Sequence, residues 1–219
     1  MKKNALVLCM LMINFISSAQ KKPELQGGLQ RFVQEKVIYP IYAQDNCIQG
    51  TVEVAFKLNK AGRITYSSVS KGIGAGLDEE ALRVLRLSSG KWKVPTNYDT
   101  NSLIRSPISF SLKGYGCEQT NPASEGLALK RYRDEVKNLD KITNHYKNLD
   151  LGRKSTENEA NITALKSQLG IDESYINRLV TIGERRLKQG DQKGACDIFM
   201  KIKYLGSEKG ERLLNKYCK

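Results

Sequence analysis

The chain has 219 residues and a formal net charge of +13, a length that accommodates one good-sized domain or two small ones. A basic chain can bind nucleic acid, but here the Lys and Arg residues are interspersed with acidic ones, and no block of like charge alternates with aromatic residues. The charge pattern therefore predicts a solvated surface and no nucleic-acid partner, with at most a weak attraction to anionic lipid headgroups or cell-wall polymers.

The first residues predict an export signal. A basic start, Lys2-Lys3, precedes an apolar run over residues 5–16, and the small residues Ser17-Ser18-Ala19 favour cleavage before Gln20. Because the run is shorter than the roughly 20 apolar residues that span a bilayer, we expect a signal peptide over residues 1–19 and an exported chain that is soluble after cleavage. The alternative is a membrane anchor, if the signal is retained.

The next segments predict a helix followed by a β-hairpin. Apolar residues in 27–36 recur at helical spacing, and Tyr39-Pro40 stops that helix because the residue before proline avoids the helical region. A short turn of helix is expected through Tyr42 and Ala43. From Thr51 to Leu58 the apolar period becomes two, which predicts a strand, and residues 63–70 continue as a second strand.

A helix and a third strand are expected next. The loop glycines Gly72, Gly74 and Gly76 lack the rest of a phosphate-binding motif and predict a plain loop. The following helix has an apolar stripe and an acidic first turn that suits the helix dipole; the stripe is Leu77, Ala81, Leu82 and Leu85, and the acids are Asp78, Glu79 and Glu80. Gly90 ends this helix, and Trp92 is expected in the core. The third strand covers Leu103–Lys113.

Topology predicts how these strands pair. A helix between the second and third strands returns the chain, so these two should run parallel to each other, with the first strand antiparallel between them. Cys47 and Cys117 then lie just outside neighbouring strand ends, which predicts a Cys47–Cys117 disulfide.

Pro107 predicts that the third strand lies at a sheet edge. Proline cannot donate to a strand ladder and is confined to edges and bulges. Such an edge can accept a partner's extended segment as an additional strand, or the proline can simply guard it against aggregation. Both interpretations remain open.

One ordered series of motifs within residues 26–112 resembles the C-terminal domain of TonB. The series is Tyr39-Pro40, Gln49–Phe56, Gly62-Arg63-Ile64, Leu77–Leu82 and Lys91-Trp92. The resemblance implies a periplasmic location and a partner-binding edge strand that pairs with receptor peptides. The residues so implicated are Leu103, Ile104, Arg105, Ser106, Pro107, Ile108, Ser109 and Phe110.

From Ser124 onward the chain is highly charged and helical in period. A long amphipathic helix is expected over residues 132–149, and Asp172 suits the N-cap of a later helix. Gly190–Leu214 loosely resembles a tetratricopeptide-type helical pair, and Cys196 and Cys218 are expected to form a second disulfide. The sequence thus predicts an α+β fold: residues 20–117 form a small antiparallel three-stranded sheet with two helices, and residues 118–219 form an all-α domain.

No catalytic, metal or cofactor constellation emerges from the sequence. His145 is the single histidine and is expected on a helix surface; no serine near it carries a nucleophile motif, and the cysteine spacing does not suit zinc. The leading hypothesis is a non-enzymatic periplasmic protein that binds an extended segment of an outer-membrane receptor or envelope protein by strand addition, in relation to TonB-dependent transport. The alternative is a structural scaffold whose helical domain docks a partner protein. After cleavage only Gln20–Gln26 would precede the TonB-like domain. Force transmission is therefore not expected unless the signal is retained and another protein supplies the reach.

Overall fold

The protein was analysed as a computed structural model, which describes residues 22–118 and 122–218; the predicted signal peptide lies outside these ranges. Three strands form the main sheet in the order β3-β2-β5. They are β2 (Gly50–Leu58), β3 (Ile64–Lys71) and β5 (Ile104–Phe110), and β2 runs antiparallel to both neighbours. The expected strand order is therefore confirmed.

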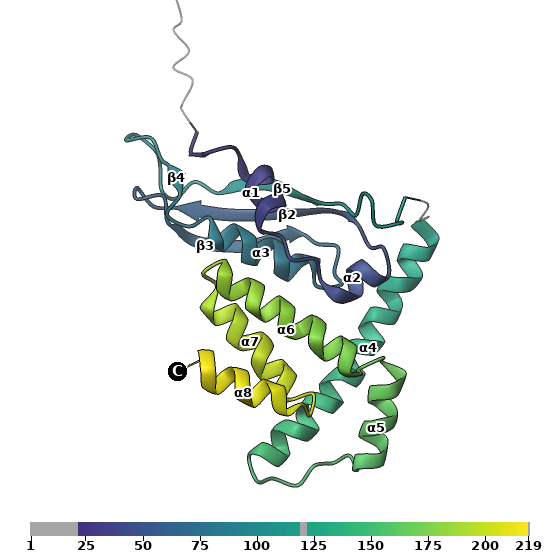
Figure 1. Cartoon of the computed structure of the whole chain (residues 1–219). Helices are drawn as coiled ribbons and strands as arrows, with labels where there is room; N and C mark the ends of the chain where they lie inside the picture. The colour runs from purple at the N-terminus through teal and green to yellow at the C-terminus, as the bar shows by residue number, and fades with distance from the viewer. Residues whose placement is uncertain (1–21, 119–121, 219) are drawn as a thin grey trace, which may run out of the picture.

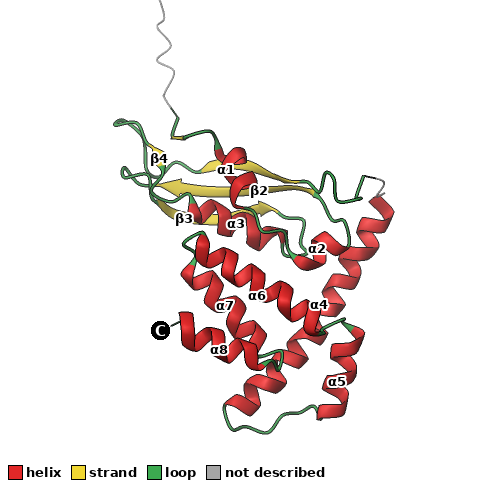
Figure 2. Cartoon of the chain, in the orientation of Figure 1, coloured by secondary structure: helices red, strands yellow, loops and turns green. Residues whose placement is uncertain are grey.

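Helices cover one face of this sheet (Figures 1 and 2). They are α1 (Leu29–Lys36), the short α2 (Ile41–Asp45) and α3 (Leu77–Leu87). The inward side chains of β2, namely Val52, Val54, Phe56 and Leu58, are fully buried against α3 and join one core with Leu29 and Val33 of α1. Trp92 packs on this core, with its ring 5.1 Å from that of Phe56.

A second, two-stranded ladder was not expected from the sequence. β1 (Glu24–Leu25) pairs antiparallel with β4 (Trp92–Lys93). Two residues are too few to show a hydrophobic period, so this pairing depends on the tertiary fold alone. The β1–β4 pairing connects the segment before α1 to the loop that follows α3.

The second half of the described chain is helical. Its elements are α4 (Pro122–Asp150), α5 (Glu159–Gln168), α6 (Glu173–Lys188), α7 (Gln192–Lys203) and α8 (Glu208–Tyr217). The side chains of Asn158, Asp172 and Asp191 each accept a hydrogen bond from a backbone N–H in the first turn of α5, α6 and α7, which satisfies donors that a helix leaves unpaired. Asp172 thus has the capping role expected of it. Consecutive helices α6, α7 and α8 pack on one another around a second core that includes Phe199 and Ile202.

His145 of α4 corrects the sequence-based expectation. Instead of lying on a helix surface, it is only 5% exposed. Its Nδ1 lies 2.8 Å from Ser155 Oγ, and its Nε2 lies 3.0 Å from Glu159 Oε2. These bonds connect α4 to the loop before α5 and to the first residue of α5.

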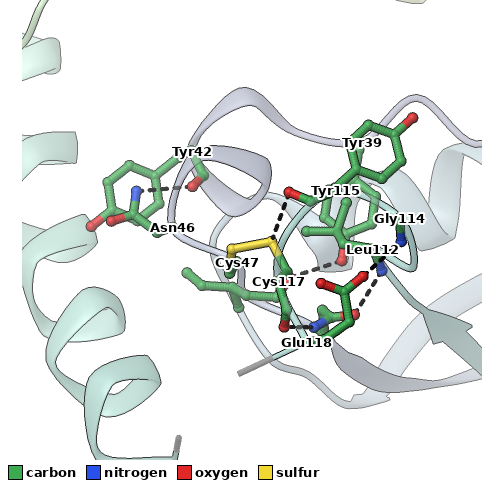
Figure 3. Close-up of a disulfide and its surroundings, with 11 residues drawn as sticks. Tyr39, Tyr42, Asn46, Cys47, Leu112, Gly114, Tyr115, Cys117 and Glu118 are labelled. Carbon is green, nitrogen blue, oxygen red and sulfur yellow. Dashed lines mark hydrogen bonds between the residues drawn. A yellow bond between two sulfur atoms is a disulfide. The ribbon is translucent and has the colours of Figure 1, made fainter. Parts of the chain in front are cut away.

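Both expected disulfides are present. Cys47 is bonded to Cys117, beside Tyr115 and Glu118 at the end of the sheet (Figure 3), and Cys196 is bonded to Cys218 between α7 and the end of α8. The side chain of Gln49 extends the β2–β5 pairing toward the first bridge, because it accepts a hydrogen bond from the Leu112 N–H and donates one to the Cys117 carbonyl. This explains why β5 ends at Phe110, before the expected limit at Lys113.

The sheet unit and the helical unit meet through α3, which lies between the sheet and the α6–α7 hairpin in Figure 1. Within the ranges described, no helix is long and apolar enough to cross a membrane.

Candidate functional site: a sheet edge and a cleft between the two units

The outer edge of β5 is the first candidate site. The register pairs Phe56 with Ile104 and Gly50 with Phe110, without a shift between them. Backbone groups of an antiparallel edge strand point alternately toward the neighbouring strand and away from it. Ser109 points both backbone groups away from β2, so the same alternation directs those of Pro107 and Arg105 outward.

Gln30 of α1 occupies one of these outward positions. Its side-chain amide donates to the Ser109 carbonyl at 3.0 Å and accepts from the Ser109 N–H at 3.1 Å, as a neighbouring strand would. Gln30 was not identified from the sequence, because a glutamine on the polar side of a helix gives no sign of a target 79 residues away.

The rest of the edge is open. Among the described residues, no partner bonds the outward N–H and C=O of Arg105 or the outward C=O of Pro107. Pro107 has no backbone N–H, but its nitrogen faces away from β2, so the β2–β5 ladder loses no hydrogen bond there.

The predicted edge residues divide between the two faces of the sheet. Ile108 and Phe110 are buried beneath the helices, while Arg105, Pro107 and Ser109 are exposed on the uncovered face. Leu103 is 44% exposed and precedes the strand. The side chains available to a partner are therefore only some of the eight that were predicted.

Arg105 organises the uncovered face. It donates to Ser70 Oγ on β3 at 2.9 Å and lies 3.5 Å from Glu53 on β2, so it spans all three strands. Its cross-strand partner Ala55 is only 3% exposed.

A buried ion-pair network joins the two units. Arg83 of α3 contacts both oxygens of Glu80 at 2.7 Å, and it also reaches Gln189 at 2.9 Å and Asp191 at 3.3 Å in the α6–α7 turn. Burial lowers the pKa of Arg83, but hydrogen bonding and charge pairing with Glu80 and Asp191 more than offset it, so the pKa is raised overall.

Glu80 lies in the first turn of α3, as expected, and also has a contact that was not predicted. Its side chain is buried and accepts a hydrogen bond from the Ile38 N–H at 2.7 Å. The i,i+3 spacing of Glu80 and Arg83 is the one sequence signal that could have indicated this pair.

A cleft of about 740 Å³ opens between the two units. Its walls come from the α1–α2 connection and α2 on one side, and from α4, α6 and α7 on the other. The cleft was not predicted, because its lining residues come from segments that lie far apart in the chain.

A serine, a histidine and a carboxylate also lie close together near the start of α5. His145 lies within hydrogen-bond distance of both Ser155 and Glu159. However, Ser155 Oγ already accepts the Glu157 N–H, and Nδ1 of the histidine, not Nε2, faces the serine. These bonds order the loop between α4 and α5.

Comparison with known proteins agrees with the resemblance found in the sequence. Residues 35–112 match the family described as Gram-negative bacterial TonB protein C-terminal. This segment contains α2, α3, the three strands of the main sheet and the end of α1. No curated protein and no solved structure matches the chain.

The matched family is non-enzymatic, and it suggests a TonB-like role in TonB-dependent transport. Such a domain implies interaction with envelope or receptor proteins, and a location in the envelope or periplasm.

Proposed function

We propose that the protein binds an extended segment of an outer-membrane receptor or another envelope protein by strand addition to β5. The observation that carries the proposal is the unpaired outward backbone of Arg105 and Pro107. An unpaired edge strand is a template for another strand, with main-chain hydrogen bonds supplying affinity.

The position of Gln30 refines this proposal. A partner strand that pairs with Arg105 and Pro107 and continues toward Phe110 meets the amide of Gln30 at Ser109. The partner either stops there or displaces Gln30. Because that amide makes two hydrogen bonds, its displacement costs binding energy, and a Gln30→Ala variant should bind a long peptide more tightly than the wild type.

Amide hydrogen exchange tests the pairing directly. Short synthetic peptides from periplasm-facing segments of outer-membrane receptors are added to the protein, and exchange at the Arg105 N–H is followed by NMR. We expect exchange at Arg105 to slow on binding, whereas the Ser106 N–H, which faces β2, is already protected.

A pair of variants separates backbone pairing from side-chain contact. Arg105→Pro removes the outward N–H and should weaken peptide binding about tenfold, the scale of one lost hydrogen bond. Arg105→Ala loses the contacts with Ser70 and Glu53 but keeps the N–H, and it should retain peptide binding. Strand addition is contradicted if Arg105→Pro and wild type bind the peptide equally and the peptide does not change exchange at the Arg105 N–H of the wild type.

The scaffold hypothesis is the second candidate, and the junction between the units favours it. Arg83 and the bidentate pair of Arg178 with Asp45, at 2.7 and 2.8 Å, fasten the helical unit to the TonB-like domain. Under this hypothesis an envelope protein captured by the wild type is also captured by Arg105→Pro.

A further inference from the structure

The cleft between the two units combines aromatic, apolar and cationic walls. Tyr42 and Tyr132 contact each other at one part of it, with ring centroids 4.9 Å apart. Leu139, Ile182 and Ile198 supply apolar surface from α4, α6 and α7. Ligand sites in proteins are typically concave, mostly apolar and equipped with a few polar groups.

Two cations line the same cleft without full compensation. Arg186 of α6 donates to the Gly194 carbonyl, but its nearest carboxylate, Glu80, is 3.8 Å away, and its buried Nε has no hydrogen-bond partner. Lys201 of α7 takes part in none of the ion pairs found among the described residues. A desolvated positive charge is costly unless a negative group pairs with it.

The pKa values of these two groups reflect the same imbalance. Burial lowers the pKa of Lys201, and the charge of Arg186 lowers it further, against an opposing effect from Asp140. Burial also lowers the pKa of Arg186, and its nearby carboxylates do not restore it. For both groups, burial therefore outweighs the effect of the nearby carboxylates.

The acidic residues that line the cleft do not supply the missing pairing. Glu80 is committed to Arg83 and the Ile38 N–H, Asp45 to Arg178, and Asp172 to the first turn of α6. The other two are Glu79 and Glu135, which lie near the tyrosines. Burial is the main cause that raises the pKa of Tyr42 and of Tyr132; the charge of Glu135 adds to it at Tyr42, and that of Glu79 at Tyr132.

We propose that this cleft binds a small organic anion with an apolar body. Its carboxylate or sulfonate group pairs with Lys201 and Arg186, and its apolar body lies against Leu139, Ile182 and Ile198. This site is separate from the β5 edge, so it can be present whether or not strand addition occurs.

A fluorescent anion tests the proposal. Anilinonaphthalene sulfonate, which has an aromatic body and one sulfonate, is titrated into the purified protein, and we expect saturable fluorescence enhancement. Lys201→Gln should weaken this binding about tenfold or more, because it removes a charge-assisted contact. Lys193→Gln is the matched control: it makes the same charge change on α7 at an exposed position outside the cleft, and should leave the affinity unchanged.

Competition with two amphiphiles of equal chain length tests the charge requirement in the wild-type protein, independently of how the variant folds. Octanoate should displace the bound probe, and octylammonium should not. Absence of saturable binding, equal affinity in Lys201→Gln and wild type, or equal displacement by the two amphiphiles would each overturn the proposal.

Discussion

At the scale of single residues, the burial of Tyr146 and its contact with Glu159 make stability depend on pH. Its hydroxyl donates to Glu159 at 3.1 Å. Burial, and then the hydrogen bond and the negative charge of Glu159, raise the pKa of Tyr146 to about 12. In the unfolded chain tyrosine ionises near pH 10.

This difference predicts an alkaline loss of stability. The contribution of Tyr146 is complete below pH 10 and disappears as the pH rises toward 12, because the unfolded state gives up its proton first. Tyr146→Phe should therefore reduce the fall in unfolding free energy between pH 9 and pH 11, by about 1 kcal/mol after allowance for solvent screening. Urea titrations at the two pH values measure the unfolding free energies. An equal fall between pH 9 and pH 11 in the variant and the wild type would contradict this role of Tyr146.

At the scale of elements, Gly210 sets how closely α8 approaches α7. A Cβ at this position would lie 2.1 Å from the Lys203 backbone nitrogen and 2.8 Å from the Phe199 carbonyl. Because backbone atoms cannot move aside as a side-chain tip can, Gly210→Ala should destabilise the protein by about 1–3 kcal/mol, measured by chemical denaturation.

Gly126 of α4 is the control for this substitution. It is also helical, but a Cβ there would meet nothing within 4 Å. Gly126→Ala should be neutral or stabilise the protein by up to about 1 kcal/mol, because alanine restricts the unfolded chain. Equal effects of the two substitutions would show that helix propensity, not close packing, decides the result.

Elements with a sustained period were predictable from the sequence. The alternation over Val52–Leu58 and the helical stripe beginning at Leu77 each reflect burial on one face, and the structure buries those faces. Pro107 indicated the edge strand, because proline has no backbone N–H to donate to a neighbouring strand, and this holds whatever the rest of the fold. The Cys47–Cys117 pairing followed from strand order.

The remaining features depend on contacts between distant segments. Nothing in the sequence near Glu80 or His145 shows that another element will cover it. His145 was therefore expected on a helix surface, and the burial of Glu80 was not predicted. The β1–β4 ladder is too short to have a period. The cleft required the packing of two units against each other, which sequence periodicity does not specify.

At the scale of the whole molecule, Arg83 couples the two units. Replacing it with Met leaves the carboxylate of Glu80, which is 3% exposed, without its 2.7 Å partner. Breaking a buried pair from one side costs about 3–5 kcal/mol, so Arg83→Met should lower the unfolding free energy by about that amount. It should also increase hydrogen exchange at the α6–α7 turn, where Gln189 and Asp191 lose a contact.

Arg86, three positions after Arg83 on α3, provides the comparison. Its side chain is exposed and bonds Ser67 at 3.0 Å. Arg86→Met should change the unfolding free energy by less than about 1 kcal/mol, and should leave exchange at the α6–α7 turn unaltered. A small effect of Arg83→Met, similar to that of Arg86→Met, would show that the network does not hold the units together.

The position of the first disulfide has a mechanical consequence. The Cys47–Cys117 bond closes a covalent ring that contains the whole main sheet, and the chain leaves this ring at Glu118 toward the helical unit. Tension applied between the segment before Cys47 and the helical unit therefore crosses the sulfur–sulfur bond and bypasses the β2–β5 hydrogen bonds. While this bond is intact, such a pull does not unzip the edge strand from its sheet.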